Sequence, residues 1–270
     1  MPTELFQGAA LITGASSGIG AAFAHALAAR GMGLLLTARR ADRLEALAAE
    51  LRTTYGVQVA LIPADLSERA DLEHVAEHAA AHAQISILVN NAGFGVAGAF
   101  PEADPPAQLA MIAVHAAAPV RLARAVLPGM IARGRGAVIN VSSIAAFVTQ
   151  GGSALYSASK LFLNGISQNL NAELRGSGVE VQALCPGFTL TEFHAAVRGG
   201  SGQRPPIPEK LWMTSEQIVE ASLKALGTGR VIVVPGAYYR WIVFGLGTPL
   251  GRALVLLRRW LRRRVRRGET

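Results

Sequence analysis

Short apolar runs alternate with longer Ala- and Leu-rich helical patterns along the chain, and this alternation constrains the fold more than any other feature. The apolar runs are residues 9–13, 34–38, 58–62, 86–90, 136–142, 179–185 and 230–234. The helical patterns cover about residues 18–30, 41–54, 67–82, 105–131, 154–175 and 214–226. Runs without polar alternation are typical of strands covered on both faces. Repeated βα units of this kind predict an α/β fold with a doubly wound parallel sheet.

The body of the chain contains no linker that would divide it into separate units. Its 270 residues, 51% hydrophobic and 16% charged, suit one large domain with a buried core rather than a disordered chain. The long irregular stretch at residues 187–210 is rich in Gly and Pro and follows the sixth run. A stretch of that length is typically a lid or a binding loop, or is disordered.

Positive charge is concentrated at the C-terminal end. Residues 252–267 contain eight arginines and no acidic residue, whereas residues 1–251 hold 18 Lys and Arg against 17 Asp and Glu. Because the body is nearly neutral, the net charge of +8 does not indicate a nucleic-acid-binding domain.

The basic segment also carries leucines at helical spacing after Thr248 and Pro249, which predicts an amphipathic helical tail. Arginines, glycines and a proline interrupt its apolar runs, so the tail does not form a transmembrane span. Two roles stay open, contact with an anionic membrane surface and docking on a neighbouring subunit or at the substrate mouth, and we favour the first. The protein would then be cytoplasmic and peripheral to the inner face of the membrane.

Several residues that often carry chemistry are interpreted as structural. His74, His78 and His82 recur every four residues, but they would face outward and nothing nearby completes a metal site, so we predict no metal. The single cysteine, Cys185, excludes an internal disulfide and fits a core position. The first residues show no secretory signal, and we expect a cytoplasmic protein.

A glycine-rich turn follows the first apolar run directly. In "TGASSGIG" (13–20), Gly14, Gly18 and Gly20 lie where a βα turn brings backbone amides close to a pyrophosphate. A tight turn without a ligand is the alternative, but the position between a strand and an apolar helix is the context that this motif requires. The turn therefore predicts a dinucleotide site.

The end of the second run indicates which dinucleotide binds. An acidic residue about 20 positions past the glycines would bind the ribose 2′-hydroxyl, whereas an arginine accommodates a 2′-phosphate. Ala38 stands where the acid would be, and Arg39 and Arg40 follow it. The two arginines could instead be solvated charges at the start of a helix. We expect NADP(H), with Arg39 as the main contact.

A tyrosine and a lysine occur four residues apart in "YSASK" (156–160), so Tyr156 and Lys160 share one face of a helix. A free tyrosine titrates near pH ~10, and a neighbouring ammonium lowers that pKa. Such a pair can exchange a proton with a carbonyl or an alcohol. Ser143 follows the fifth run, at the sheet edge where ligands of doubly wound folds bind. Taken alone, the pair could also be a lysine packed beside a half-buried tyrosine.

Together these motifs resemble those of the short-chain dehydrogenase/reductase family. "TGASSGIG", "NNAG" (90–93), "VSS" (141–143), "YSASK" and "PG" (186–187) have the family's order and spacing over about residues 5–235. The resemblance implies a Rossmann fold with seven parallel strands and hydride transfer from nicotinamide. It implies a dinucleotide-binding and catalytic domain over residues 1–237, with a substrate loop at 187–213, and leaves residues 238–270 as the tail.

The resemblance also implies roles for individual residues. Tyr156 would be the acid–base residue, Ser143 would hold the substrate oxygen, and Lys160 would bind the nicotinamide ribose and tune Tyr156. The expected cofactor contacts are Gly14, Ser16, Ser17, Gly18, Ile19, Gly20, Arg39, Arg40, Asp65, Leu66, Asn91, Ala92, Gly93, Tyr156, Lys160, Pro186, Gly187, Thr189 and Thr191.

One position departs from the family pattern. His115 stands in "VHAAAPVRLARAVLP" where the family usually has an asparagine that helps to hold a water behind the lysine. Histidine can donate and accept hydrogen bonds and titrates near neutrality, so it could serve as a fourth catalytic residue in the proton relay. Packing without a proton role is the alternative.

We therefore expect an NADP(H)-dependent oxidoreductase that interconverts a lipophilic carbonyl compound, a ketone or 3-oxoacyl chain, and its alcohol. Phe188, Phe193, His194 and Trp212 suggest an apolar pocket. The alternative is an NADP(H)-binding redox sensor or scaffold with little turnover. Relatives commonly pair through the helix that carries "YSASK", whose second apolar stripe predicts a homodimer or homotetramer.

Overall fold

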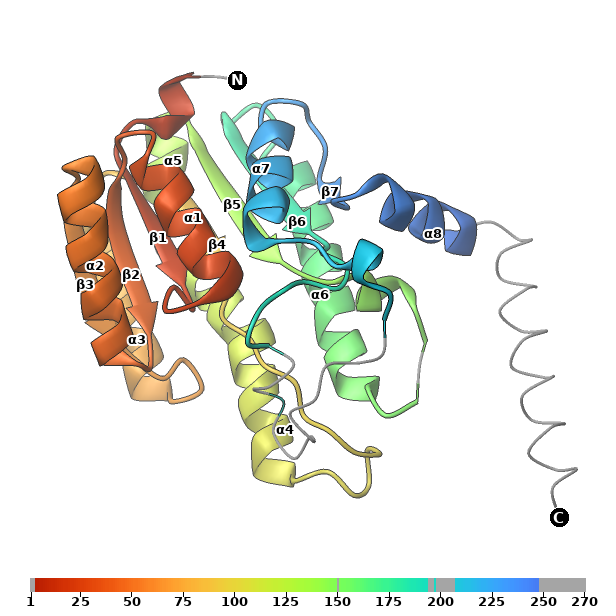
Figure 1. Ribbon diagram of the computed structural model, residues 1–270. Coiled ribbons are helices and arrows are strands. Elements are labelled where there is room, and N and C mark those ends of the chain that lie inside the picture. Colours follow the sequence, from red (N-terminus) through yellow and green to blue (C-terminus); the bar gives the residue numbers. More distant parts are fainter. Residues whose placement is uncertain (1–2, 150, 194–196, 198–206, 248–270) are drawn as a thin grey trace, which may run out of the picture.

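The computed structural model describes residues 3–149, 151–193, 197 and 207–247 (Figure 1). The strands are β1 (Ala9–Thr13), β2 (Gly33–Ala38), β3 (Val59–Pro63), β4 (Ile85–Asn90), β5 (Gly136–Val141), β6 (Val179–Leu184) and β7 (Ile232–Val233). The helices are α1 (Gly18–Ala28), α2 (Ala41–Tyr55), α3 (Arg69–Ala81), α4 (Pro105–Ile112), α5 (Ala118–Ala132), α6 (Ala154–Glu173), α7 (Ser215–Ala225) and α8 (Ala237–Gly247).

The strands form one parallel sheet in the order β3-β2-β1-β4-β5-β6-β7. The strand order reverses between β1 and β4, so the connections on the two sides of this point leave the sheet in opposite directions. Ligands of doubly wound folds bind at such a point, outside the carboxyl ends of the strands. The predicted Rossmann fold with seven parallel strands is confirmed.

Helices cover both faces of the sheet. α1 packs against α2 and α7 on one face, and α3 packs against α5 on the other, together with α4 and α6 (Figure 1). Successive strand residues point to opposite faces, so the central strands supply both cores: Ile12 and Val89 face α1, whereas Leu11 and Leu88 face α5. This explains why the runs are apolar without alternation.

The helical pattern at 105–131 is interrupted in the structure. A π-helical turn, Ala113–Ala117, separates α4 from α5, and His115 is buried at its centre. Such turns often mark functional sites. By length and composition, the whole stretch Pro105–Ala132 is the one described helix that could cross a membrane. Its residues Met111, Leu122 and Val126 pack in the core beneath the sheet, which is the behaviour of a core helix.

A helix that the sequence analysis did not predict precedes the predicted tail helix. A helix, α8, begins at Ala237, whereas the predicted helix begins at Thr248 and Pro249, which lie outside the described residues. Gly236 adopts φ +81 before α8, and Tyr239 on its first turn is buried against the body. The predicted boundary at 237/238 therefore falls inside a packed segment.

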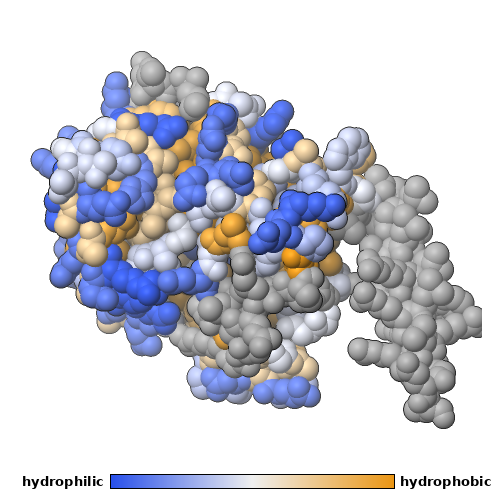
Figure 2. All heavy atoms as spheres, viewed as in Figure 1, coloured by the Kyte–Doolittle hydropathy of each residue, from blue (hydrophilic) through white to orange (hydrophobic). Residues whose placement is uncertain are grey.

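The loop between β6 and α7 is anchored where it leaves and rejoins the sheet. Its two ends run side by side, because the Leu190 amide donates to the Met213 carbonyl and the Met213 amide donates to that of Phe188. Thr214 and Gln217 then form the predicted capping box at the start of α7. Leu190 in this loop is 44% exposed, and Figure 2 shows apolar patches between hydrophilic ones on this face of the molecule.

Candidate active site

One cavity of about 690 Å³ lies at the carboxyl ends of the central strands. It extends from the glycine loop after β1, past β4 and β5, to Tyr156 on α6. The expected residues that line it are Gly14, Ser16, Ser17, Gly18, Ile19, Arg39, Arg40, Asp65, Leu66, Asn91, Ala92, Gly93, Ser143, Tyr156, Lys160, Pro186, Gly187, Thr189 and Thr191. Gly20 and His115 are not among its lining residues.

The glycines of the first turn permit close approach of backbone segments. Gly14 and Gly18 have φ +63 and +56, which side chains rarely adopt. A Cβ on Gly14 would lie 2.9 Å from Ala92 Cα, and one on Gly20 would lie 2.3 Å from the Gly14 carbonyl oxygen. Gly20 therefore serves the packing of α1 against the turn, and Gly14 and Gly18 form the cavity floor.

The loop after β4 is bonded to the glycine turn. Thr13 Oγ1 accepts hydrogen bonds from the amides of Asn91 and Ala92, each at 2.9 Å. Asn91 Nδ2 donates to the carbonyls of Thr13 and Gly14, at 2.9 and 3.1 Å. Asn91 is thus a structural link between two loops as well as a cavity residue. Its amide group holds the phosphate-binding turn in place.

The arginines after β2 lie at the far end of the cavity from Tyr156. Arg39 Nη1 lies 3.7 Å from Asp65 Oδ2, an ion pair between the ends of β2 and β3. Arg40 reaches the glycine turn, where its Nη2 donates to Ser16 Oγ at 3.2 Å and to Ser17 Oγ at 2.9 Å. The cavity therefore has two cationic groups where Ala38 supplies no carboxylate.

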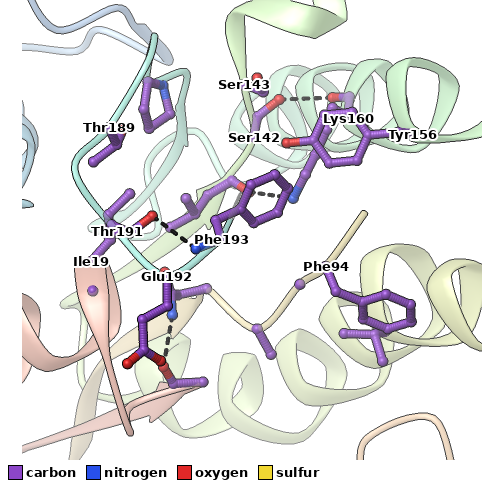
Figure 3. A pocket seen from close by; sticks show the side chains of 18 of the residues that line it. Ile19, Phe94, Ser142, Ser143, Tyr156, Lys160, Thr189, Thr191, Glu192 and Phe193 are labelled. Carbon is purple, nitrogen blue, oxygen red and sulfur yellow. Dashed lines mark hydrogen bonds between the residues drawn. The ribbon is translucent and has the colours of Figure 1, made fainter. Parts of the chain in front are cut away.

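Ser143, Tyr156 and Lys160 meet at the other end (Figure 3). Ser143 follows β5 and accepts a hydrogen bond from the Ala145 amide at 3.1 Å, which caps a short 3-10 helix. Lys160 is buried on α6, and its Nζ donates to the Val141 carbonyl at 2.9 Å. The same Nζ lies 5.7 Å from the centroid of the Tyr156 ring. The Ser143 and Tyr156 side chains are close enough to hydrogen-bond, so both can act on one substrate oxygen, and Lys160 lies behind the Tyr156 ring.

Burial perturbs both titratable groups of the pair. It raises the pKa of Tyr156 to about 12, with a smaller opposing effect from a hydrogen bond with Ser143. It also lowers the pKa of Lys160 to about 8. The net pKa of Tyr156 therefore lies above that of a free tyrosine rather than below it, because the loss of hydration disfavours the phenolate. At neutral pH the phenol is protonated.

Both ring nitrogens of His115 make polar contacts that fix the orientation of the side chain. Nε2 accepts the Phe94 amide hydrogen at 3.1 Å, so the proton of the neutral ring resides on Nδ1. Nδ1 lies 2.9 Å from Ser159 Oγ, whose own hydroxyl donates to the Tyr156 carbonyl. Burial, together with the Lys160 charge, holds the pKa of His115 well below 6.5. This geometry favours packing over a proton relay: His115 joins the loop after β4 to α6.

The Tyr156 ring is held between aromatic neighbours. Its centroid lies 5.7 Å from that of His115 and 5.7 Å from that of Phe193. Phe94, Phe188 and Phe193 add apolar surface to the cavity near the catalytic end. A carbonyl compound with an apolar substituent fits this lining.

Comparison with known proteins identifies the family. The family model described as short chain dehydrogenase matches residues 8–201, more than half of the chain. The chain belongs to the short-chain dehydrogenase family. It is accordingly a carbonyl/alcohol oxidoreductase that uses a nicotinamide cofactor.

Individual relatives of this short-chain dehydrogenase cover most of its length. The very-long-chain 3-oxoacyl-CoA reductase of Anas platyrhynchos is 32% identical over 241 residues, 86% of this chain and 74% of the relative. A short-chain dehydrogenase from Sphingobium yanoikuyae in complex with NADPH is 38% identical, covers 94% of each chain and has a TM-score of 0.79. The bulky-bulky ketone specific alcohol dehydrogenase from Comamonas testosteroni is 33% identical over 94% of this chain and 92% of its own, with a TM-score of 0.75.

Two residues of the dehydrogenase site escaped the sequence analysis. Glu192 lines the cavity and pairs with Arg40, but it lies in an irregular loop where no spacing distinguishes one acidic residue from another. Tyr239 fills the space above Gly187, where a Cβ would lie 2.2 Å from the Tyr239 ring, and its hydroxyl contacts the substrate loop. Tyr239 lies in the tail that the sequence predicts, and no sequence signal indicates that it contacts Gly187, which lies far from it in the sequence.

Cys185 lies at a core position, and His74 and His78 lie on the exposed face of a helix, as the sequence predicts. Cys185 is buried, and burial raises the pKa of its thiol to about 12, which is unsuited to a nucleophile. His74 and His78 lie on α3 with their rings 4.3 Å apart. Within residues 3–149, 151–193, 197 and 207–247, no three His, Cys, Asp or Glu side chains gather as a metal site would require.

Proposed function

We propose that this protein is an NADP(H)-dependent carbonyl reductase, with Tyr156 as its acid–base residue and a lipophilic ketone or 3-oxoacyl compound as its substrate. One observation carries the proposal. A single cavity joins Ser143, Tyr156 and Lys160 at one end to Arg39 and Arg40 at the other. The two ends of the cavity match the two ends of such a cofactor, its reactive nicotinamide and its phosphorylated adenosine.

The bound cofactor supplies hydride chemistry. The chain's own residues handle the oxygen and the proton. Ser143 Oγ holds the substrate oxygen by a hydrogen bond, and Tyr156 Oη donates a proton to that oxygen as the carbonyl is reduced. The raised pKa of Tyr156 keeps the phenol protonated at neutral pH, which suits the reductive direction. Lys160, buried behind the ring, supplies positive charge that stabilises the phenolate left after transfer.

The preference for NADP(H) is supported by the residues after β2. A carboxylate at position 38 would favour a free ribose 2′-hydroxyl, and Ala38 supplies none. Arg39 and Arg40 both line the cavity there, and the similar protein from Sphingobium yanoikuyae binds NADPH.

The lipophilic substrate class is supported by the apolar lining near Tyr156. Phe94, Val148, Phe188 and Phe193 line this part of the cavity. Similar proteins reduce very-long-chain 3-oxoacyl-CoA or act on bulky ketones, according to their names. A large apolar substituent is therefore a better fit than a sugar.

The proposal is tested with purified protein, NADPH or NADH, and a panel of alkyl ketones, aryl ketones and 3-oxoacyl thioesters. We expect NADPH oxidation with the longer or bulkier members, abolished in Tyr156→Phe, which binds NADPH as before. Arg39→Ala should raise the KM for NADPH far more than that for NADH. Tight NADPH binding without turnover on any carbonyl would instead favour the redox sensor.

Assembly and location are part of the same proposal. Exposed apolar side chains on α6, Leu161 at 56% and Phe162 at 41%, suit a homodimer or homotetramer packed through that helix. On α8, Tyr238, Trp241 and Phe244 are also exposed, and the chain continues from there into the arginine-rich segment. Aromatic side chains beside basic residues suit the surface of an anionic membrane. A cytoplasmic protein that binds the inner membrane face is the location we infer.

A further inference from the structure

An acidic side chain of the substrate loop pairs with two arginines at the start of α2, Arg40 at its N-cap and Arg43 on its first turn. Glu192 Oε2 lies 2.9 Å from Arg40 Nη1, and Glu192 Oε1 lies 2.7 Å from Arg43 Nη1. These are charge-assisted hydrogen bonds between segments about 150 residues apart in sequence. They lower the pKa of Glu192, chiefly through Arg43, so this carboxylate is ionised at neutral pH.

The arginine that Glu192 contacts is already part of the nucleotide end of the cavity. Arg40 bridges Glu192 to the hydroxyls of Ser16 and Ser17 on the glycine turn. Arg40 also lies two residues after Ala38, the position where an acidic residue would bind the ribose 2′-hydroxyl. An anion, Glu192, therefore occupies Nη1 of a guanidinium that lines the nucleotide end of the cavity.

We propose that Glu192 is a cofactor-specificity residue, because its carboxylate and a ribose 2′-phosphate compete for Arg40 and Arg43. The inference rests on the proposed NADP(H) preference. A dianionic phosphate with three acceptor oxygens displaces one carboxylate from two arginines, whereas a ribose 2′-hydroxyl does not. NADP(H) and NAD(H) therefore leave Glu192, and the loop that carries it, in different positions.

The loop position matters at the catalytic end, because the neighbours of Glu192 lie there. Figure 3 shows Glu192 and Phe193 extending from the loop in different directions, Phe193 towards the Tyr156 ring and Glu192 away from it. On the other side, Thr191 Cγ2 would lie 2.9 Å from a Cβ at Gly18, so the loop covers the glycine turn. Release of Glu192 thus moves the residues that border both the pyrophosphate site and the catalytic tyrosine.

The first test measures binding of 2′,5′-ADP and 5′-AMP by titration calorimetry at low ionic strength, with no turnover involved. These probes differ by the 2′-phosphate. We expect Glu192→Gln to strengthen 2′,5′-ADP binding about two- to fivefold, as the removal of one exposed competing ion pair would. The fold-change in affinity for 5′-AMP should be less than about half of the fold-change for 2′,5′-ADP. The matched control is Glu220→Gln, which removes the same charge from a pair with Lys224 on α7 and should change neither affinity.

The outcomes separate this inference from the proposed function. Equal affinity of the wild-type protein for the two probes would overturn the NADP(H) preference itself. A clear wild-type preference for 2′,5′-ADP that is unchanged or weakened in Glu192→Gln would overturn the role of Glu192 alone. The second readout is hydrogen exchange of amides 187–193. We expect faster exchange with 2′,5′-ADP than with 5′-AMP in the wild-type protein and no such difference in Glu192→Gln.

Discussion

Lys160 is a buried cation whose single described side-chain hydrogen bond goes to a backbone carbonyl. Its pKa falls from 10.5 to about 8, and at about 1.4 kcal/mol for each pH unit its burial costs the folded state about 3 kcal/mol at neutral pH. Between these two pKa values the unfolded chain binds more protons than the folded one. Stability from this group therefore rises as the pH increases from 8 towards 10.5.

Lys160→Met should consequently raise the free energy of unfolding at pH 7 while abolishing activity. The gain is reduced by the Val141 carbonyl, which loses its donor at a cost of about 1 kcal/mol, so we expect a net gain of about 2 kcal/mol. The difference between the two proteins should shrink as the pH approaches 10.5. Urea unfolding at pH 7, 8.5 and 10 measures it, and a variant less stable than wild type at pH 7 would contradict the account.

His115 differs from Lys160, because we expect its ring to stay neutral between pH 5 and 8. Both ring nitrogens are engaged and its pKa lies well below 6.5. His115→Asn should therefore leave the shape of the pH profile of kcat/KM unchanged between pH 5 and 8. Its smaller side chain loses packing against the Tyr156 ring and should lower stability by about 1–2 kcal/mol. Loss of a titration step from the profile would instead assign His115 to the proton relay.

At the scale of elements, α8 and the substrate loop form one unit. Tyr239 Oη accepts the Phe188 amide hydrogen at 3.1 Å and donates to the Leu211 carbonyl, so one hydroxyl fixes both ends of the loop. Burial raises the pKa of this phenol, which keeps it available as a donor.

Tyr239→Phe should loosen the loop without changing the fold. We expect stability to fall by about 1–2 kcal/mol, because the Phe188 amide and the Leu211 carbonyl lose a buried partner. The KM for the carbonyl substrate should rise several-fold, and NADPH binding should change less. Steady-state kinetics and thermal unfolding measure this, with Tyr238→Phe on the exposed face of α8 as the matched control. Equal effects of the two substitutions would contradict the anchoring role.

Sequence reasoning predicted the elements whose pattern is local. Strand β1 was predicted with its observed bounds and β5 to within one residue, because apolar runs between turn residues are legible in short windows. The π-helical turn at 113–117 was not predicted, since helical periodicity hardly changes across one extra residue. β7 is shorter than its run, because it pairs with β6 at the sheet edge through two residues.

In the candidate site, too, residues in local motifs could be predicted and contacts made by loops could not. Ser143 could be located because it follows a predicted strand at its carboxyl end, and Tyr156 and Lys160 because four residues separate them on one predicted helix. Contacts made by a loop are not encoded by period or spacing, so the pairing of Glu192 with α2 and the packing of Tyr239 on Gly187 required coordinates. The direction of the Tyr156 pKa shift also required coordinates, because the burial of the side chain decides that direction.

At the scale of the whole molecule, the exposed aromatic side chains of α8 directly precede the arginine-rich segment in the sequence. We expect deletion of residues 249–267 to abolish sedimentation with anionic vesicles while leaving NADPH binding intact. Full-length protein should detach as salt increases, because charges are screened over about 8–10 Å at physiological ionic strength. Sedimentation with anionic and neutral vesicles at low and high salt tests this.

A separate variant tests the aromatic part of that surface. Replacing Trp241 and Phe244 by alanine removes exposed apolar area without altering charge, and should weaken vesicle binding in a less salt-dependent way. Protein that ignores vesicles at low salt, together with a lower melting temperature or a changed oligomeric state after deletion, would assign the segment to subunit packing.

Tyr239 lies 51 residues beyond the amide that it contacts, whereas the glycine turn and the loop bonded to it belong to the first 92 residues. During synthesis the nucleotide-binding edge can therefore assemble while α8, the last helix of the described residues, has not yet been made. The nascent chain would acquire affinity for a nucleotide before it becomes a catalyst, because the ring that covers Gly187 arrives last. A chain shortened after Gly236 is accordingly expected to retain NADPH in a binding assay and to lose turnover.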